Sequence, residues 1–487
     1  MNTSPVDWIS WTVLLWGLGA AYAVLIGAMI VAVLSENRNP LKSIAWITAL
    51  LLFPVGGALL YYFFGRSLRN VRMISRRNRR KLLSVEPVHG ASKIPRNVSP
   101  AHRQSMRLAV SVADAMVYTG NDIEIFNNGE SFFRSLFDDL RRATTFINMQ
   151  FYIIANDSLG RELRDILIER AAAGVKIRVI YDYIGSFDAS RRDFFMRMKD
   201  AGVEVHSFFR IQFPGKLNRL NWRNHRKVVV IDGKAGYIGG MNVADRYVNG
   251  GQFKVWRDTC VRVTGPAVAG LQYNFAIDWK FMGHQLLTDE SAKDMPPERR
   301  ADSVADVTVQ LVTSGPADRW GAASFLFLKV IGNARKRIYI QTPYFLPSDG
   351  LLKSLQCAAL SGVDVRVMLP RKSDSAVLTY ASCSYIEECL LAGIKIYLYE
   401  AGMLHAKVLI VDDDFATTGS TNFDFRSFEH NFEENIVMYS PEVNRRMTAR
   451  FLEDSACCTR LRIGEWSRRD RGDKARQSLC RLLSPIL

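Results

Sequence analysis

The sequence lacks paired cysteines. Its seven cysteines form an odd number, and none of them stands in a CxxC spacing. A secreted disulfide framework and a structural zinc module both need such pairs. We therefore predict reduced thiols, with neither a disulfide scaffold nor a zinc site.

Two common devices of phosphate chemistry are also missing. The sequence has no compact cluster of carboxylates of the kind that binds magnesium, and no glycine-rich loop that would hold the phosphates of a nucleotide. These absences argue against magnesium-dependent phosphoryl transfer and against a nucleotide-activated donor. We expect no metal and no other cofactor.

Two stretches near the N-terminus lack charged residues altogether. They cover residues 8–34 and 44–65, and each exceeds the roughly 20 residues that a helix needs to cross a bilayer. The first stretch is longer than the apolar core of a signal peptide and is followed by the second stretch. We predict a hairpin of two transmembrane helices over residues 1–65.

Acidic residues are absent from the segment that follows, residues 66–81, which carries eight arginines and lysines. By the positive-inside rule this segment faces the cytoplasm, and so does the rest of the chain. The net charge of +16 at pH 7 favours a polyanionic partner. Beside a membrane helix, anionic lipid headgroups are the nearer polyanion, and we expect no nucleic acid as a partner.

One motif is present twice. Residues 225–232 read HRKVVVID and residues 405–412 read HAKVLIVD, and each copy is followed by a small-residue turn that ends in Asn, at residues 239–242 and 419–422. A single copy could be an ordinary strand that ends in an Asp–Gly turn. Two copies with matching continuations argue against that reading.

The spacing places the His and Lys side chains of each copy on the same face of a strand, because side chains alternate between faces. The Asp has the opposite parity, which suits a structural role in the turn. Two such surfaces facing each other across a pseudo-twofold axis would bind and cleave a phosphodiester. The motif residues are His225, Lys227, Asp232, His405, Lys407 and Asp412, with Asn242 and Asn422 as phosphate-binding residues.

Helices and strands alternate in both halves of the chain, which predicts an α/β fold with a largely parallel sheet in each half. The matching order of elements indicates a duplicated domain. The predicted domains are a hairpin at 1–65, a basic juxtamembrane segment and linker at 66–120, a first domain at 121–288, a linker at 289–306, a second domain at 307–465 and a basic amphipathic tail at 466–487. The tail could pack on the body or lie at the membrane interface.

The doubled motif resembles the HxKxxxxD signature of the phospholipase D superfamily, and within it the chain is most similar to bacterial cardiolipin synthases with two N-terminal membrane segments. Further matches are WRDT at 256–259, QTPYF at 341–345, FRSF at 425–428 and NFE at 431–433. One departure is Gly240 where the second copy has Ser420. The resemblance implies two phospholipase D-like α/β/α domains, with central mostly parallel mixed sheets that form one pseudo-twofold active site.

The resemblance also implies the reaction. A phosphatidyl group would pass from one phosphatidylglycerol to another through a phosphohistidine, giving cardiolipin and glycerol. His225 would be the nucleophile and His405 the acid and base, while Asp258 and Glu433 would orient imidazoles by hydrogen bonds. The location would be the bacterial inner membrane, with two spans and cytoplasmic catalytic domains. The sequence leaves the oligomeric state open.

Three other interpretations remain at this stage. A phospholipase D hydrolase, or a phosphatidyltransferase that uses a different alcohol, would share every motif residue. The net charge also suits a membrane-tethered nucleic-acid binder or nuclease, whose binding should weaken steeply with salt. A lipid-organising protein with a vestigial site is disfavoured, because both motifs are intact.

Overall fold

The structure is a computed structural model of the whole chain. It describes residues 5–35, 40–65, 73–84, 94–95, 98–191, 193–210, 221–288 and 299–484. The chain divides into two compact units, and each is described by itself. One unit contains residues 1–67 and 211–221, and the other contains residues 68–210 and 222–487.

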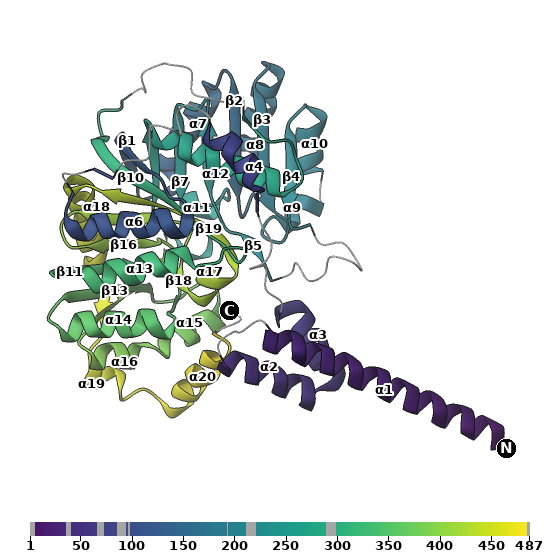
Figure 1. The fold of residues 1–487 in the computed structure, drawn as a ribbon. Coiled ribbons are helices and arrows are strands. Elements are labelled where there is room, and N and C mark those ends of the chain that lie inside the picture. The colour runs from purple at the N-terminus through teal and green to yellow at the C-terminus, as the bar shows by residue number, and fades with distance from the viewer. Residues whose placement is uncertain are drawn as a thin grey trace. The chain divides into compact units, whose positions relative to one another are not determined.

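The N-terminal unit begins with helix α1, Pro5–Ser35, which is continuous (Figure 1). Its part from Trp11 to Ser35 is long and apolar enough to cross a membrane, and among the described residues no other helix meets that measure. Most of its apolar side chains are exposed, for example Trp16 at 77%. An apolar surface of this extent fits a lipid environment better than water.

The second predicted span, residues 44–65, is helical but interrupted. It consists of α2, Pro40–Leu52, then α3, Pro54–Leu60, and a π-helical turn, Tyr61–Gly65. The break falls at Phe53, whose ψ of 80° is not helical, because Pro54 disfavours the α conformation of the residue before it. The hairpin is therefore present only in part as predicted: two helical arms pack on each other, but the second arm is broken.

The larger unit is built on one 16-stranded sheet. Its strands in the first half of the chain are β1 (Val117–Phe126), β2 (Phe146–Phe151), β3 (Lys176–Asp182), β4 (Glu204–Phe208), β5 (Arg223–Asn224), β6 (Val228–Ile231), β7 (Ala235–Gly239) and β9 (Cys260–Thr264). Those in the second half are β10 (Val304–Ser314), β11 (Arg337–Gln341), β13 (Asp364–Pro370), β14 (Lys395–Tyr399), β16 (Val408–Val411), β17 (Phe415–Gly419), β19 (Asn431–Tyr439) and β20 (Cys458–Arg460). Two two-stranded ladders join β8 (Trp256–Arg257) to β15 (Met403–Leu404) and β12 (Phe345–Leu346) to β18 (Phe423–Asp424).

The strand order shows the duplication directly. From the middle outward, the first half runs β1-β9-β7-β6-β2-β3-β4 and the second runs β10-β19-β17-β16-β11-β13-β14-β20, with β1 and β10 antiparallel at the centre. The duplicated α/β fold is thus confirmed, but two features differ from the prediction. The two halves share one sheet, and the sheet is mostly antiparallel. Among the described strands, the parallel pairs lie between β2, β3 and β4, between β11, β13 and β14, and between β5 and β19. The reason is that each motif strand turns back as a hairpin, so that β6 and β16 pair antiparallel with both neighbours.

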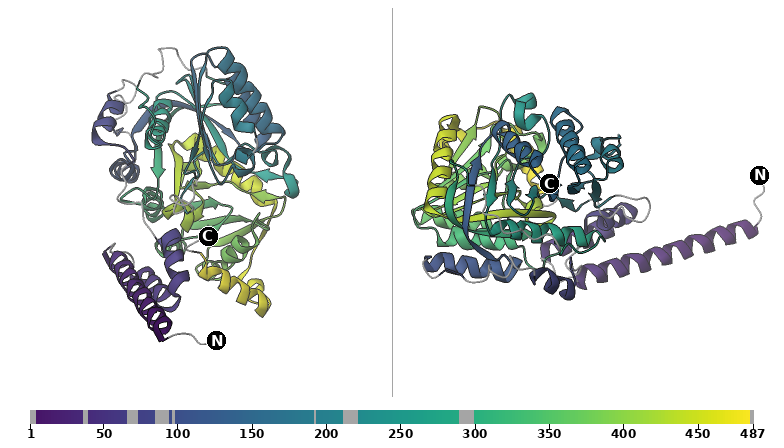
Figure 2. Two further views of the ribbon diagram at one scale, coloured as in Figure 1. Left: turned by 90° about the vertical axis from the view of Figure 1, so that its right-hand side faces the viewer. Right: turned by 90° about the horizontal axis from the view of Figure 1, so that it is seen from above.

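Helices cover the sheet on both sides (Figure 2). Those of the first half are α7 (Gly129–Arg141), α8 (Ser158–Ala172), α9 (Phe187–Arg191), α10 (Phe194–Asp200), α11 (Arg246–Asn249) and α12 (Ala267–Phe281). Those of the second half are α13 (Ala322–Asn333), α14 (Asp349–Leu360), α15 (Ala376–Cys383), α16 (Ile386–Leu391), α17 (Phe425–Glu429), α18 (Pro441–Ala456), α19 (Ile463–Trp466) and α20 (Arg471–Leu482). α12 and α18 pack on one apolar core that includes residues of both motif strands, such as Val230 and Ile410.

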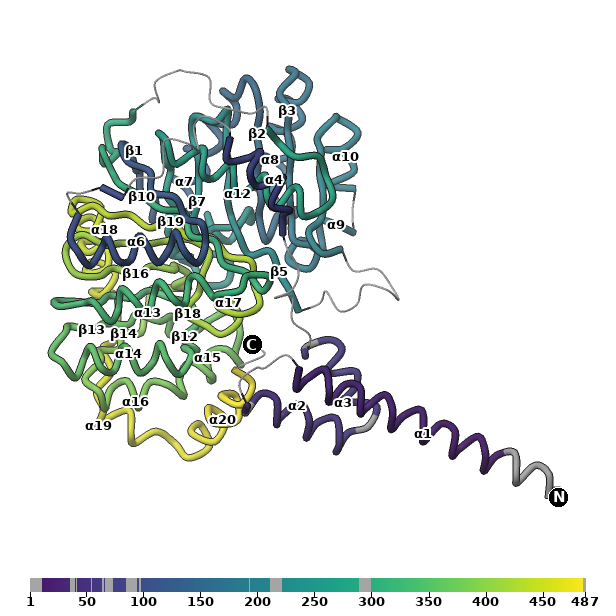
Figure 3. Tube along the Cα trace, viewed as in Figure 1, coloured from purple at the N-terminus to yellow at the C-terminus, as the bar shows by residue number. Residues whose placement is uncertain are grey.

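Two helices outside the repeats complete the unit. α4, Arg76–Leu83, holds the described part of the basic segment, whereas α6, Pro100–Ala113, precedes the first half in sequence but packs on α13 of the second (Figure 3). The C-terminal helix α20 packs against α15, with the Arg481 guanidinium 4.1 Å from the Tyr385 ring centroid. The C-terminal tail therefore packs on the body, which is one of the two arrangements that the sequence left open. Residues 289–298 of the predicted linker lie outside the described residues.

Candidate active site

The two motif histidines lie just before the central strands β6 and β16, whose residues are all buried. Each is fixed by the opposite half of the chain. The backbone N–H of His225 donates to the Phe432 carbonyl at 2.9 Å, and that of His405 donates to the Arg257 carbonyl at 2.7 Å. These bonds extend two short parallel ladders, β5 with β19 and β15 with β8.

The carboxylate partners of the imidazoles are also exchanged between the halves. Nδ1 of His225 lies 3.0 Å from both oxygens of Glu433, and Nδ1 of His405 lies 2.7 Å from Oδ2 of Asp258. A carboxylate beside Nδ1 holds the proton there and orients the ring, so that Nε2 is left for chemistry. The sequence predicted that these two acids orient imidazoles, but it did not show that each serves the other half's histidine.

The imidazoles differ at Nε2. Within the described part of the chain, Nε2 of His225 has no hydrogen-bond partner, whereas Nζ of Lys407 lies 3.3 Å from Nε2 of His405 and 2.6 Å from its Nδ1. The Tyr152 ring stands edge-on to His225 at 5.1 Å, and the Tyr247 and Trp256 rings lie 5.9 and 5.4 Å from His405. Aromatic walls keep water away from the imidazoles while leaving one nitrogen of His225 open.

Burial dominates the protonation of the histidines. It lowers the pKa of His225 and of His405 to about 4, against the opposing effects of Glu433 and Asp258. An imidazole that is neutral at pH 7 can act as a nucleophile or a base. The pKa values of Glu433 and Asp258 are lowered as well, because the neighbouring histidines and lysines outweigh the effect of burial. For an acid, a lowered pKa favours the charged carboxylate.

Both motif lysines are buried, at 3% exposure each. Burial lowers the pKa of Lys227 to about 7 and lowers that of Lys407. Lys407 also lowers the pKa of both His225 and Lys227, which means that charges of the second half act on the first-half motif. Charged groups of both halves therefore act on one site, and the two buried lysines favour an anion there.

The motif aspartates lie in the turns after the motif strands and not beside the imidazoles. Asp232 accepts hydrogen bonds from the backbone N–H groups of Thr144, Thr145 and Phe146, and Asp412 accepts from those of Arg335, Lys336 and Arg337. Both aspartates adopt a left-handed conformation, with φ of 53° and 50°. This is the structural placement that strand parity predicts, and it does not fit a direct role at phosphorus.

The two asparagines are held differently. Oδ1 of Asn242 accepts from the Ile153 N–H at 3.0 Å, and its Nδ2 donates to the Tyr247 hydroxyl at 2.7 Å. Among the described residues, Oδ1 of Asn422 is buried without a partner. Asn242 thus positions the loop and the Tyr247 ring, and the second N–H of its Nδ2 is the one left for a phosphate.

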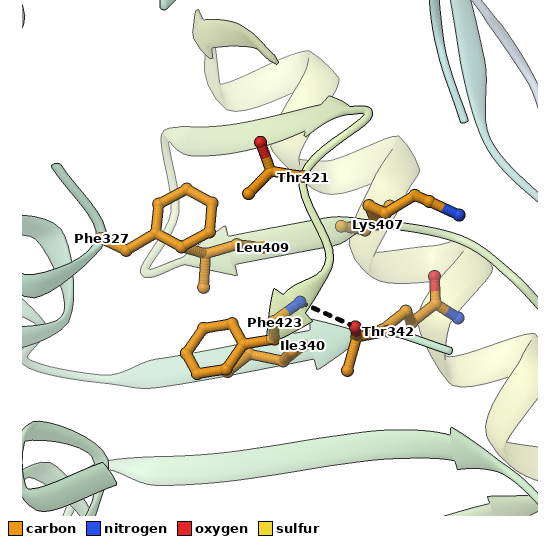
Figure 4. A pocket seen from close by; sticks show the side chains of 9 residues that line it. Phe327, Ile340, Thr342, Lys407, Leu409, Thr421 and Phe423 are labelled. Atoms are coloured by element: carbon orange, nitrogen blue, oxygen red, sulfur yellow. Dashed lines mark hydrogen bonds between the residues drawn. The ribbon is translucent and has the colours of Figure 1, made fainter. Parts of the chain in front are cut away.

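A small cavity adjoins Lys407 (Figure 4). Its walls are mostly apolar and include Leu409 and Phe423, while the Lys407 amine points away from them. Such a lining does not suit a phosphate. Among the described residues, no group of three or more His, Cys, Asp and Glu side chains could hold a metal ion.

Sequence reasoning missed the aromatic rings around the imidazoles and a nearby cation, Arg246. A signal for Arg246 exists in the sequence, since Arg follows the turn Asn by four residues in both copies, at Arg246 and Arg426. The rings carry no comparable signal, because Tyr247 and Trp256 have no aromatic counterparts at the same spacing in the second copy.

Comparisons with known proteins agree with this geometry. The family model described as "Cardiolipin synthase, PLD-like domain" matches residues 136–279 and 327–455, and the model "Phospholipase_D-nuclease N-terminal" matches residues 23–66. The first pair of matches falls on the two halves of the sheet. The second falls on the N-terminal helices.

Full-length relatives and a solved structure point the same way. The chain is 38% identical over 472 residues to cardiolipin synthase 2 of Bacillus anthracis, covering 96% of this chain and 90% of that protein. It is 36% identical to the major cardiolipin synthase ClsA of Bacillus subtilis over 471 residues, covering 94% and 96%. A crystal structure of phosphatidylserine synthase from Haemophilus influenzae has a TM-score of 0.59 and 14% identity, covering 80% of this chain and all of that one, which shows a shared fold.

Proposed function

Because this chain belongs to the cardiolipin synthase family of phospholipase D-like proteins, we propose that it moves a phosphatidyl group from one phosphatidylglycerol to another, releasing glycerol and forming cardiolipin. The observation that carries the proposal is the pair of buried imidazoles, each with Nδ1 held by a carboxylate of the opposite half. One phosphorus flanked by two such imidazoles can be attacked from one side and released on the other.

The first step uses the open nitrogen of His225. The anionic donor opposes the effect of burial on the pKa of His405, so that His405 takes up a proton when the donor binds. Nε2 of His225 then attacks phosphorus, the bond from phosphorus to the glycerol oxygen breaks, and protonated His405 gives that oxygen its proton. In the second step the hydroxyl of the acceptor attacks phosphorus, the phosphorus–nitrogen bond breaks, and His405 takes the hydroxyl proton. A diester is exchanged for a diester, so no activated donor is needed.

The assignment of His225 as the nucleophile is supported by the difference at Nε2. This atom of His225 is free to attack, whereas Nε2 of His405 lies within reach of Lys407. Bound phosphate would attract the Lys407 ammonium and free His405 for proton transfer. Asp258 and Glu433 contribute by orienting the imidazoles. Asp232 and Asp412 contribute by holding the turns that follow the motif strands.

Lys227 and Lys407 are the groups proposed to hold the non-bridging phosphate oxygens. Their pKa values, lowered by burial, would rise when an anion binds, because a neighbouring negative charge favours the ammonium form. Preorganised cations stabilise the charge that develops at phosphorus in the transition state. The amide groups of Asn242 and Asn422 would supply further donors once phosphate is bound.

The N-terminal apolar helix and the match of residues 23–66 support a membrane location. We propose in addition that α2 and α3 together make a second crossing, so that the chain after residue 65 faces the cytoplasm. The basic residues of α4, including Arg76, Arg77 and Lys81, would then contact anionic headgroups of the inner leaflet.

The decisive experiment follows lipid products. Purified protein is mixed with vesicles of labelled phosphatidylglycerol, and cardiolipin, phosphatidic acid and glycerol are measured alongside an acid-labile, alkali-stable phosphoenzyme. The expected result is cardiolipin with an equivalent of glycerol, and a loss of at least ~10³-fold in His225→Ala and His405→Ala. Phosphatidic acid as the main product would indicate a hydrolase, and full turnover in either variant would exclude the two-histidine scheme. Inhibition by DNA that persists at physiological salt would instead favour a nuclease.

A further inference from the structure

Arg246 is a cation at the active site for which the described residues offer no anion. It opens α11, and its guanidinium carbon lies 5.2 Å from the Trp256 ring centroid and 5.7 Å from that of Tyr247. In the described part of the chain no carboxylate pairs with it, and its Nε is buried without a hydrogen-bond partner. Nε is buried without a partner in Arg469 as well, but that arginine pairs with a carboxylate, so what sets Arg246 apart is the lack of a carboxylate among the described residues. A cation left unpaired beside the site points to an anion that arrives from outside the chain.

The position of Arg246 relates it to both histidines. The Trp256 ring that it covers lies 5.4 Å from the His405 ring, so one indole separates the guanidinium from the imidazole. On the other side, Arg246 acts on Tyr152, whose ring contacts His225, and opposes the rise that burial causes in the pKa of that tyrosine. Arg246 therefore lies one aromatic ring away from each imidazole without touching either.

The reaction requires a second anion site at about this place. The donor phosphate occupies the two lysines, but an acceptor phosphatidylglycerol brings a phosphate of its own, which is not broken and lies one glycerol bridge from the attacking hydroxyl. Water and glycerol carry no such group. A cation placed for this second phosphate would favour a lipid acceptor over both of them.

We propose that Arg246 binds the phosphate that the acceptor phosphatidylglycerol retains, and so selects a phosphate-bearing alcohol as the acceptor. This inference rests on the proposed function. A guanidinium presents its N–H groups as a planar fork, which matches two phosphate oxygens better than an ammonium does. The aromatic contacts fix the side chain before the lipid arrives, which lowers the entropic cost of binding.

Other arginines near the site are less suitable. Arg223 is paired with Asp182 at 3.2 Å. For Arg426, which matches Arg246 in the second copy, burial together with Arg223 lowers the pKa.

The test compares two acceptors in the same full-length protein. Phosphatidylglycerol vesicles are incubated with labelled glycerol, and two products are measured: cardiolipin, for which the acceptor carries a phosphate, and labelled phosphatidylglycerol, for which it does not. Both products share the donor, the phosphoenzyme and the proton transfer through His405. For Arg246→Gln we expect cardiolipin formation to fall about tenfold to a hundredfold while glycerol exchange stays within about twofold of wild type. Arg246→Lys should recover part of the loss.

A matched control is Arg469→Gln. Arg469 also covers an indole, with its guanidinium carbon 4.0 Å from the Trp466 centroid, but it belongs to the C-terminal segment and pairs with Glu387. Both of its products should remain at wild-type levels. An equal fall of both products in Arg246→Gln, or no fall in either, would overturn the inference. A wild-type protein that makes no cardiolipin would instead refute the proposed function, so the two failures are distinguishable.

Discussion

Each motif histidine depends on a carboxylate that the other half of the chain supplies. Glu433 lies beside His225 and Asp258 beside His405, and all four residues are less than a tenth exposed. The carboxylates fix which ring nitrogen carries the proton, and a wrong tautomer would leave Nε2 unable to attack or to accept a proton. Because each carboxylate contacts the histidine of the opposite half, its role in the reaction is set by the role of that histidine.

Amide variants should separate these tasks. We expect Glu433→Gln and Asp258→Asn each to lower cardiolipin formation by about 10²- to 10⁴-fold, because an amide cannot fix the tautomer or stabilise an imidazolium as a carboxylate does. A phosphatidyl ester of p-nitrophenol, whose leaving group needs no proton, should restore phosphoenzyme formation in Asp258→Asn but not in Glu433→Gln. The measurement is nitrophenol release together with trapped phosphoenzyme.

The control for this pair is Glu442→Gln, which removes an exposed carboxylate that pairs with Arg445 and Arg446 on α18. It should leave both assays unchanged. If nitrophenol restores the Glu433 variant and not the Asp258 variant, the nucleophile is His405 and the proposed roles are exchanged.

The motif residues themselves could be predicted from the sequence, because strand parity sets the faces of His, Lys and Asp without any tertiary information. The partners could not. Asp258 and Glu433 follow Asn242 and Asn422, but nothing in a linear spacing tells which imidazole each acid reaches once two halves interlock. Arg246 was missed for a similar reason. What singles it out is that no carboxylate among the described residues pairs with it, and a linear sequence does not show such pairing.

At the level of elements, α6 connects the two halves in an unexpected way. It precedes the first half, yet Met106 and Ala109 are buried in the core of the second half, and the Gln310 side chain of β10 donates to the carbonyls of Met106 and Ala115. The sequence analysis placed this stretch in the juxtamembrane segment and linker at residues 66–120. A linker helix and a core helix have the same apolar spacing, and only the tertiary partner distinguishes them.

A substitution on each face of α6 tests its contribution. Met106→Ala removes a fully buried side chain and should lower the free energy of unfolding by about 2–5 kcal/mol. Val110→Ala, on the same helix at 40% exposure, should change it by less than about 1 kcal/mol. Denaturant unfolding of the detergent-solubilised protein gives both values. Equal effects of the two changes would mean that α6 does not pack into the second half in solution.

Other elements show where sequence patterns are sufficient and where they fail. The strands at Lys176–Asp182 and Lys395–Tyr399 follow from their apolar runs, because parallel strands buried on both faces need such runs. β19 was missed, since Glu433, Glu434 and Asn435 interrupt its apolar pattern although every residue of the strand is buried. Glu433 is buried because it contacts the His225 imidazole, whereas Glu434 accepts from Asn274 and Asn435 accepts from Thr421. Hydrophobic patterning fails where buried polar side chains have such partners.

For the whole molecule, the shared sheet explains why the site needs both halves. β1 and β10 pair antiparallel in the middle of the sheet. Two short parallel ladders, β5 with β19 and β8 with β15, place a strand of each half beside the histidine of the other. The duplication was visible in the sequence, but the fusion of the sheets was not. Pairing between repeats depends on edge strands such as β1 and β10, which lie outside the repeated helix–strand pattern.

The break at Phe53 makes the number of membrane crossings a question that an experiment can answer. If α2 and α3 complete a second crossing, the loop at residues 36–39 lies on the opposite side of the membrane from the larger unit. If they turn back, the loop and the larger unit share one side. Asn37→Cys should therefore react with an impermeant thiol reagent in intact spheroplasts, whereas the native Cys357 and Cys457, both exposed in the structure, should react only after lysis. Protection of the Asn37→Cys thiol in intact cells would establish a single crossing, and labelling of Cys357 or Cys457 there would place the larger unit outside the cytoplasm.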